Sequence, residues 1–297
     1  MNLMILAAGL GTRLRPYTLE LPKPAIPFLG APLASYSLSL LDGIKINRLV
    51  VNSHHLPDKI EALFRELKLP AKSLHFSLEG NQILGSGGGI NNARSLLADQ
   101  GDFLVMNGDE VILPHDPWML KEFLAYHKWS KSIATLLVMK HPEVGKKFGG
   151  VWVEEGKDQV KCFAKTPIAG LCGYHYLGVL AFQDKIFRYF KNPLQSENIL
   201  YDTLTMAISQ HEQVSIYCCE TEWFENGTVE DFVSSASYYC DQLTSDLENK
   251  TNLNYWKTYL AGTLRYYGTE KKVVENNFPE LSQKLDRLWQ ALKINSR

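Results

Sequence analysis

The sequence predicts an α/β protein whose central sheet is mostly parallel and is covered by helices on both faces. Two observations indicate this fold class. Short apolar runs, typical of buried strands, alternate with helical patterns through the first half of the chain, and glycine-rich or acidic loops follow where several runs end. Hydrophobic residues make up 45% of the 297 residues, which is ample for one large domain with an appendage, or for two domains.

Strands and helices alternate up to Asn107. The expected strands are Leu3–Ala8, Leu49–Asn52, Leu74–Leu78 and Phe103–Asn107. The first expected helix is Leu33–Leu41, which follows a proline, a residue that the start of a helix tolerates. The second has apolar residues at i, i+3, i+4 and i+7, namely Ile60, Leu63, Phe64 and Leu67, and the third is Ile90–Leu97. Because ligands bind such sheets at the carboxyl ends of the strands, the loops after Ala8 and Asn107 are expected to converge on one pocket.

The second half is richer in strands, and the tail changes character. Strands are expected at Ile133–Met139, Gly150–Glu154, Val160–Ala164, Tyr174–Phe182 and Val214–Cys218, and helices at 184–190, 197–209 and 229–243. Asp246–Asn254 is polar and predicts a linker, and Tyr255–Tyr267 predicts a helix. Leu281, Leu285, Leu288 and Leu292 fall on one side of a last helix, which packs on its own domain or forms a dimer seam. We therefore expect a main domain, 1–243, and a small C-terminal helical extension, 244–297.

Composition excludes several classes of protein. A net charge of −1 and a pI near 6.7 argue against binding to nucleic acid through bulk electrostatics. We find no apolar run of the length that a membrane span needs and no signal-peptide pattern. The five cysteines are odd in number and form no Cys-x-x-Cys, as expected for reduced thiols in a cytoplasmic protein.

A glycine-rich loop with fixed cations follows the first strand. The residues Met4-Ile5-Leu6-Ala7-Ala8-Gly9-Leu10-Gly11-Thr12-Arg13-Leu14-Arg15-Pro16 lead to Pro22-Lys23-Pro24. A strand, then bare backbone amides, then cations is a combination that binds a polyphosphate. A P-loop is excluded, since the chain has no Gly-x-x-x-x-Gly-Lys-Ser/Thr. A dinucleotide fingerprint is excluded, since Leu14 replaces its third glycine and the second strand ends in Asn52 instead of an acidic residue.

These motifs resemble those of the sugar-1-phosphate nucleotidyltransferases, whose signature is Gly-x-Gly-Thr-Arg-Leu-x-Pro followed by Pro-Lys-Pro. The resemblance runs through residue 235, and the stretch 79–90 is most similar to the N-acetylmuramate-1-phosphate uridylyltransferase and mannose-1-phosphate guanylyltransferase types. It implies a Rossmann-like nucleotidyltransferase fold and transfer of a nucleoside monophosphate from an NTP, UTP first and GTP second, to a sugar-1-phosphate. It also implies Mg²⁺ as cofactor, a cytoplasmic monomer or homodimer, and a role in making cell-wall or polysaccharide precursors.

The resemblance also assigns residues to the nucleotide side of the site. Arg13 is expected to bind the β- and γ-phosphates and Lys23 to supply a second cation, in agreement with the loop chemistry. The further nucleotide-binding residues are expected to be Ala8, Gly9, Gly11, Thr12, Glu79, Gly87, Gly88 and Asn107. For the successive glycines, a purely structural loop that caps the next helix remains an alternative.

Two carboxylates are the expected metal ligands. Asp109 follows a buried strand and a glycine, where a hard oxygen ligand suits Mg²⁺. Glu225 occupies the place of the second aspartate that is usual in the family, in Trp223-Phe224-Glu225-Asn226-Gly227-Thr228. Alternatively, Glu225 is structural, or Mg²⁺ is held by Asp109, phosphates and water.

On the sugar side, the resemblance assigns the phosphate of the sugar-1-phosphate to Lys165, while Ala164 replaces the usual glutamate. Tyr176 and Gly178 match the segment whose glycine lets the hexose approach. Two other functions remain open: a cytidylyltransferase acting on a phosphorylated alcohol such as phosphocholine, and a non-catalytic nucleotide- or sugar-binding regulatory protein of the same fold.

Overall fold

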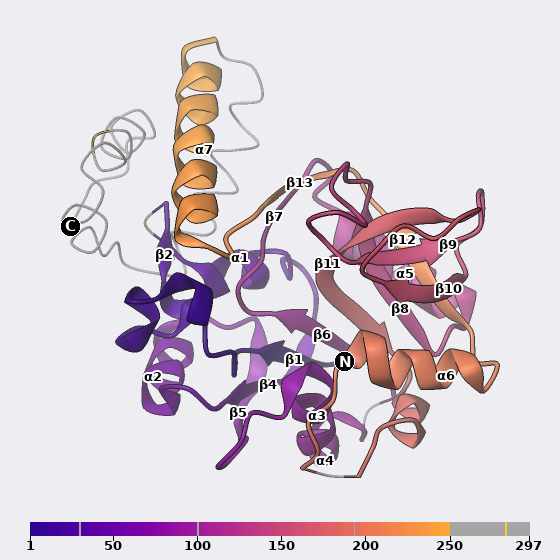
Figure 1. The fold of residues 1–297 in the computed structure, drawn as a ribbon. Coiled ribbons are helices and arrows are strands. Elements are labelled where there is room, and N and C mark those ends of the chain that lie inside the picture. Colours follow the sequence, from indigo (N-terminus) through magenta and orange to yellow (C-terminus); the bar gives the residue numbers. More distant parts are fainter. Residues whose placement is uncertain (30, 100, 193, 250–282, 284–297) are drawn as a thin grey trace.

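A central sheet of nine strands runs through the part of the chain that the computed structural model describes, residues 1–29, 31–99, 101–192, 194–249 and 283 (Figure 1). Its strands are β1 (Asn2–Leu6), β4 (Ile46–Ser53), β5 (Ala71–Leu78), β6 (Phe103–Asn107), β8 (Ala134–Met139), β9 (Gly150–Val153), β10 (Val160–Ala164), β11 (Cys172–Phe182) and β12 (Val214–Cys218). Two small two-stranded sheets join β2 (Pro27–Phe28) to β3 (Ala31–Pro32), and β7 (Val111–Pro114) to β13 (Thr221–Phe224).

The strand order is β10-β9-β11-β6-β1-β4-β5, with β8 also beside β11 and β12 beside β8. Neighbours are parallel from β6 through β1 and β4 to β5, which confirms the sheet predicted for the first half. Strand β11 pairs antiparallel with β6, β8 and β9, so the second half of the chain extends the sheet as a mixed part in which β11 runs against all its neighbours. The parallel half brings the carboxyl ends of β1, β4, β5 and β6 to one edge.

Helices cover both faces. They are α1 (Leu33–Ser39), α2 (Pro57–Glu66), α3 (Gly85–Asn92), α4 (Arg94–Leu97), α5 (Met119–Ser130), α6 (Thr205–Ser209) and α7 (Val229–Asn249). Short 3₁₀ turns are η1 (Thr12–Leu14), η2 (Tyr17–Leu19), η3 (Lys23–Ala25) and η4 (Asp184–Arg188), and η5 (Ile199–Leu204) is a π-helix. No described helix has both the length and the apolar character needed to cross a membrane.

Alternate residues of β1 pack into different cores. Leu3 and Ile5 join the core under α1, α2 and α5, whereas Met4 joins the core under α3 and α4. A third core lies under α7, where the Phe28 ring contacts Phe232 edge to face at 5.5 Å. The buried runs of the parallel strands are therefore explained by cover on both faces.

Several predicted boundaries are corrected. The helix expected at Ile90–Leu97 begins at Gly85, before the three glycines, and breaks at Ala93 into α3 and α4. The segment expected as one helix at 197–209 is a π-helix followed by α6, and 184–190 holds only a 3₁₀ turn. Helix α7 continues through Asn249, so the first residues of the expected linker are helical. The helix expected at Tyr255–Tyr267 lies outside the described residues, as does the one around Leu281–Leu292 apart from residue 283.

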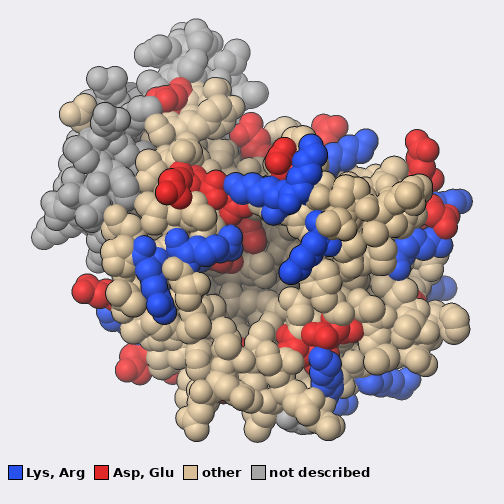
Figure 2. Space-filling view, in the orientation of Figure 1, with Lys and Arg blue, Asp and Glu red and all other residues tan. Residues whose placement is uncertain are grey.

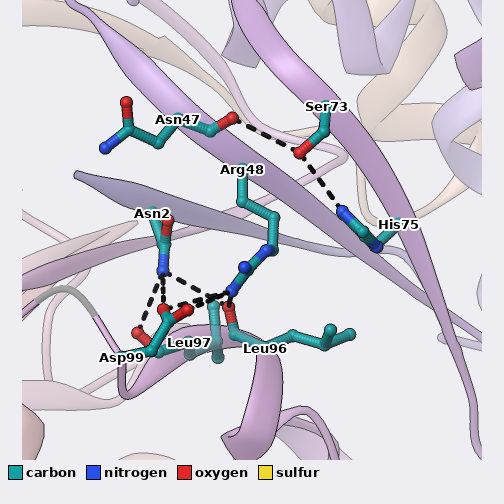
Figure 3. Close-up of polar contacts among 8 residues, drawn as sticks. All are labelled: Asn2, Asn47, Arg48, Ser73, His75, Leu96, Leu97 and Asp99. Atoms are coloured by element: carbon teal, nitrogen blue, oxygen red, sulfur yellow. Dashed lines mark hydrogen bonds and ion pairs between the residues drawn. The ribbon is translucent and has the colours of Figure 1, made fainter.

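A polar clamp ties α4 to the amino ends of β1 and β4 (Figure 3). Asn2 is fully buried, and its Nδ2 donates to Asp99 Oδ1 at 2.8 Å and to the carbonyls of Leu96 and Leu97. Arg48 Nη1 donates to Leu96 O at 2.6 Å and to both Asp99 oxygens. The clamp satisfies the carbonyls at the end of α4 and lies at the edge of the sheet opposite the carboxyl ends.

We expect Asn2→Ala to lower the free energy of unfolding by about 1–3 kcal/mol, because buried acceptors lose their donor. As a control, Arg65→Met removes one side of an exposed 3.4 Å pair with Glu61 and is expected to cost below about 1 kcal/mol. Urea unfolding of both variants measures the difference. Equal stability of Asn2→Ala and the wild type would show that the clamp contributes nothing.

Candidate active site

A cavity of about 440 Å³ opens at the carboxyl ends of the parallel strands. Figure 2 shows a hollow on this face, with Lys and Arg side chains on both sides of it. The predicted residues that line the cavity are Ala8, Gly9, Gly11, Thr12, Arg13, Lys23, Glu79, Asn107 and Asp109. The convergence of loops that sequence position implied is therefore present in the fold.

The loop after β1 presents bare backbone to the cavity. Gly9 is exposed, and a Cβ at this position would meet no other atom within 4 Å, so packing does not require its glycine. Gly11 adopts φ 61° and directly precedes η1, and its carbonyl accepts hydrogen bonds from Leu14 N and Thr18 Oγ1. A Cβ on Gly11 would lie 2.7 Å from Thr18 Cγ2. Gly11 thus fixes the turn, while Gly9 leaves room for a ligand.

Lys23 and Asp109 form an ion pair inside the cavity, with Lys23 Nζ 2.7 Å from Asp109 Oδ2. Lys23 begins η3, whose next residue, Pro24, packs close to Gly108. Gly108 N donates to Leu6 O at 2.9 Å, and a Cβ on Gly108 would lie 2.9 Å from the Ile5 side chain. The close contact of β1 with the end of β6 therefore sets the position of Asp109 opposite Lys23.

Arg13 lies over Gly227 at the start of the segment that leads to α7. A Cβ on Gly227 would be 2.8 Å from Arg13 Nη1 and would collide with Glu225 Oε1. The same Glu225 oxygen accepts a hydrogen bond from Gly227 N at 2.8 Å. Asn226 Nδ2 donates to Asp109 O at 2.8 Å, which fastens this segment to the loop after β6. Gly227 is therefore the point where Arg13 and the segment 225–227 meet.

A buried polar chain joins three strand ends. Asn52 Oδ1 accepts from Ala7 N at 2.7 Å, and Asn52 Nδ2 donates to Glu79 Oε1 at 2.6 Å. The second oxygen of Glu79 accepts from Leu84 N at 2.8 Å. Burial raises the pKa of Glu79 above its ordinary value, against the effect of these hydrogen bonds. A Cβ on Gly89 would lie 2.6 Å from Glu79, so this glycine makes room for the chain.

A second carboxylate, Glu110, lies beside Asp109. Its Oε1 accepts from Asn107 Nδ2 at 3.0 Å and its Oε2 from Trp223 Nε1 at 2.8 Å. Burial, and then the neighbouring Asp109, raises the pKa of Glu110. Burial raises the pKa of Tyr176 well above its usual value, and Glu110 adds to this effect. Asn107 is thus oriented by a carboxylate that the sequence analysis left without a role.

Other predicted residues lie away from the cavity wall. Gly87 and Gly88 are buried, and both of their N–H groups donate to Glu197 O, so these groups are occupied by the protein. Gly178 has φ 73° and is buried, where a Cβ would lie 2.7 Å from both Asn107 and Glu110. Packing against protein atoms gives each of these three glycines a structural reason, and their contact with a ligand stays a prediction.

Lys165, Tyr176 and Glu225 are also absent from the residues that line the cavity. Lys165 is exposed just after β10, and Tyr176 is partly buried in β11. The cavity wall also includes Gly85 and Ser86, from the loop Leu84–Gly89 that is expected to face the base, and two residues to which the sequence analysis gave no binding role, Asn52 and Gly227. Asn52 was detectable, since it ends a strand at the same edge as Asn107.

Mg²⁺ fits this cavity only with help from a substrate. Within the described residues, no group of three or more His, Cys, Asp and Glu side chains is arranged to hold a metal ion. Mg²⁺ is, however, commonly bound by one or two protein carboxylates together with substrate phosphates and water. Asp109 meets this requirement because its side chain is partly exposed at the cavity. Glu225 is a weaker candidate, since one of its oxygens already accepts from Gly227 N.

The fold and the cavity define an α/β protein with bare backbone, cations and a carboxylate together at the edge of a parallel sheet, an arrangement that suits an anionic ligand. A model of the nucleotidyl transferase family matches residues 2–242, and the chain belongs to this family.

Similar proteins include two curated relatives. One is a mannose-1-phosphate guanylyltransferase catalytic subunit beta from Dictyostelium discoideum, 30% identical over 82% of this chain and 66% of its own. The other is a UTP–glucose-1-phosphate uridylyltransferase from Synechocystis, 28% identical over 78% of this chain and 61% of its own. The chain thus spans somewhat less than two thirds of these relatives. The solved structure of HddC from Yersinia pseudotuberculosis in complex with GMP-PN shares the fold, with a TM-score of 0.63 and 21% sequence identity. The match covers 80% of this chain and 99% of the HddC chain.

Proposed function

We propose that this protein transfers a nucleoside monophosphate from an NTP, UTP first and GTP second, to a sugar-1-phosphate, forming an NDP-sugar and pyrophosphate. The observation that carries the proposal is the cavity in which Arg13, the Lys23–Asp109 pair and the open backbone at Gly9 meet. The names of the relatives support both nucleotides, because one is a uridylyltransferase and the other a guanylyltransferase. Both act on sugar-1-phosphates by name.

The reaction needs no general base. An oxygen of the sugar phosphate forms a bond to the α-phosphorus of the NTP, and the bond from that phosphorus to the bridging oxygen of the β-phosphate breaks. Pyrophosphate leaves with the electron pair. The second pKa of a phosphate is about 6, so the nucleophile is already ionised at neutral pH. The main barrier is the repulsion between two anions, which favours a site built from cations and backbone amides.

In this proposal Arg13 and Lys23 stabilise the charge that develops on the departing pyrophosphate. The guanidinium of Arg13 can bind two oxygens at once, whereas Lys23 acts as a point charge. When bound, Mg²⁺ supplies further neutralisation of phosphate charge. Asp109 is its proposed ligand, with Glu225, whose Oε1 accepts from Gly227 N, as a second candidate. Glu79 and the neighbouring Gly85 and Ser86 form the proposed wall for the base, because they line the cavity next to the loop after β1.

The sugar phosphate is assigned to the β10–β11 side, with Lys165 as its cation. We expect Lys165→Ala to raise the KM for the sugar-1-phosphate about ten-fold and to leave the KM for the NTP within about two-fold, since one charge-assisted contact is lost. Lys161→Ala is the matched control, because Lys161 is exposed on β10, the strand that Lys165 follows, and pairs with Glu154 at 2.9 Å. A change confined to the KM for the NTP would show that Lys165 does not bind the sugar phosphate.

Pyrophosphate release tests the proposed function. The purified chain is incubated with each of four NTPs, a panel of sugar-1-phosphates and Mg²⁺, with EDTA as the control. Release that requires UTP or GTP, a sugar-1-phosphate and Mg²⁺ is the expected result. Release with CTP and phosphocholine alone would favour the alternative cytidylyltransferase. Binding of nucleotide without turnover in any combination would favour a regulatory protein.

We place the reaction in the cytoplasm, in the synthesis of cell-wall or polysaccharide precursors.

A further inference from the structure

A distant segment of the chain supports the loop that enters α3. Glu197 N donates to Leu84 O at 2.8 Å, and Glu197 O accepts from Gly87 N at 2.8 Å and from Gly88 N at 3.3 Å. Two residues further on, Ile199 N donates to Ser86 Oγ at 3.0 Å. These contacts join the start of α3 to the beginning of η5, which lies beside it and leads into α6 (Figure 1).

The contact is close enough to require glycine. A Cβ on Gly85 would lie 2.7 Å from Glu197 O, and one on Gly87 would lie 3.0 Å from Glu197 Cγ. A Cβ on Gly88 would lie 2.5 Å from Gln195 O. The successive glycines therefore let the loop and the segment around Glu197 pack backbone to backbone.

The side chain of Glu197 is buried, with 3% of its surface exposed, and it is absent from the cavity wall. Its Oε1 accepts from Thr203 Oγ1 at 2.6 Å and its Oε2 from Lys191 N at 3.0 Å. Among the described residues, no Lys or Arg pairs with this carboxylate. Burying a carboxylate without a cation is costly unless hydrogen bonds compensate, and both donors here suit a group that only accepts. The carboxylate therefore fixes the two ends of the segment 191–203 to each other.

The peptide of Leu84 is held from both sides. Its carbonyl accepts from Glu197, and its N–H donates to Glu79, which lines the cavity. The next two residues, Gly85 and Ser86, also line the cavity. Movement at Glu197 would thus be transmitted directly to the wall that we assign to the base of the nucleotide.

We propose that Glu197 is a positioning residue for the nucleotide: it holds the Gly85–Ser86 wall in the conformation that binds the NTP, without touching the NTP. The inference rests on the proposed function, because it assumes that this wall faces a nucleotide. A wall that is ordered before binding spares the ligand the entropic cost of ordering it, so loss of the support is expected to weaken nucleotide binding specifically.

The test is isothermal titration of the full chain with UTP and Mg²⁺, with GTP in a parallel series, together with the KM for the sugar-1-phosphate. We expect Glu197→Ala to weaken nucleotide binding about ten-fold, as for a lost buried acceptor, and to change the KM for the sugar-1-phosphate less than about two-fold. Glu197→Gln is expected to recover most of the affinity, because its amide can accept from Lys191 N and donate to the Thr203 hydroxyl. If Glu197 contributed only to stability, its loss would lower the melting temperature without weakening nucleotide binding more than sugar-1-phosphate binding.

Two further variants complete the test. Thr203→Val removes one donor to the carboxylate, and we expect about three-fold weaker nucleotide binding; it decides the question should Glu197→Ala fail to fold. Glu212→Ala is the matched control. The Glu212 side chain accepts from the Tyr189 hydroxyl at 2.7 Å and does not line the cavity, so this variant is expected to bind nucleotide like the wild type. Unchanged nucleotide affinity in the folded Glu197 or Thr203 variants, or equal losses for both substrates, overturns this inference alone. A wild-type chain that binds neither UTP nor GTP overturns the proposed function and this inference with it.

Discussion

Replacing Asp109 with asparagine is expected to lower kcat about 10³-fold, equivalent to ~4 kcal/mol of transition-state stabilisation. The change keeps the size of the side chain and leaves an oxygen that can accept from Lys23, so the 2.7 Å contact in the cavity can persist. What is lost is the negative charge that the proposal assigns to Mg²⁺. Steady-state pyrophosphate release, measured across a range of Mg²⁺ concentrations, checks the prediction.

The melting temperature of Asp109→Asn is the control. The ion pair is partly exposed, so its loss is expected to change the free energy of unfolding by less than about 1 kcal/mol. A stable variant with a rate within ten-fold of the wild type would remove Asp109 from the catalytic machinery. A reduced rate that high Mg²⁺ partly restores would be the clearest support for the metal assignment.

Arg13→Ala is expected to lower kcat/KM about 10²–10³-fold, because a paired contact to phosphate oxygens that carry developing charge is removed. Arg15→Ala is the matched control: Arg15 is exposed two residues away on the same loop and is absent from the cavity wall. Kinetics of the two variants, side by side, separate a local role of Arg13 from a general effect of positive charge. Equal losses in both would mean that the loop acts only as a basic surface.

The parallel half of the fold was predictable from the sequence because its strands are buried on both faces and read as continuous apolar runs. The position of the cavity followed, since residues after Leu6 and Asn107 must share one edge of the sheet. Helix α5 was not predicted, because its pattern of buried residues is not purely apolar. Its buried face includes His127, so a polar residue interrupts the apolar period, and the partner of its Nδ1, Thr135 Oγ1 at 2.7 Å, comes from the neighbouring strand β8.

The glycines show where local patterns stop being informative. A glycine at positive φ, or in a run, signals that something approaches the backbone closely, but not what approaches. Gly178 accommodates Asn107 and Glu110, and Gly88 accommodates Gln195, whereas Gly9 faces open space. Likewise, the pairing of β7 with β13 joins short segments that are far apart in sequence, so neither strand is apparent without its partner. The roles of Gly88 and Gly178 and the pairing of β7 with β13 therefore depend on contacts between residues that are far apart in the sequence.

The most direct test of the account is a crystal structure of the chain with Mg²⁺ and a non-hydrolysable UTP or GTP analogue. We expect the triphosphate to lie along the backbone from Gly9 to Arg13, with the Arg13 guanidinium and Lys23 Nζ on its oxygens and the metal beside Asp109. A triphosphate bound elsewhere, with the Lys23–Asp109 pair intact and Arg13 in solvent, would contradict it.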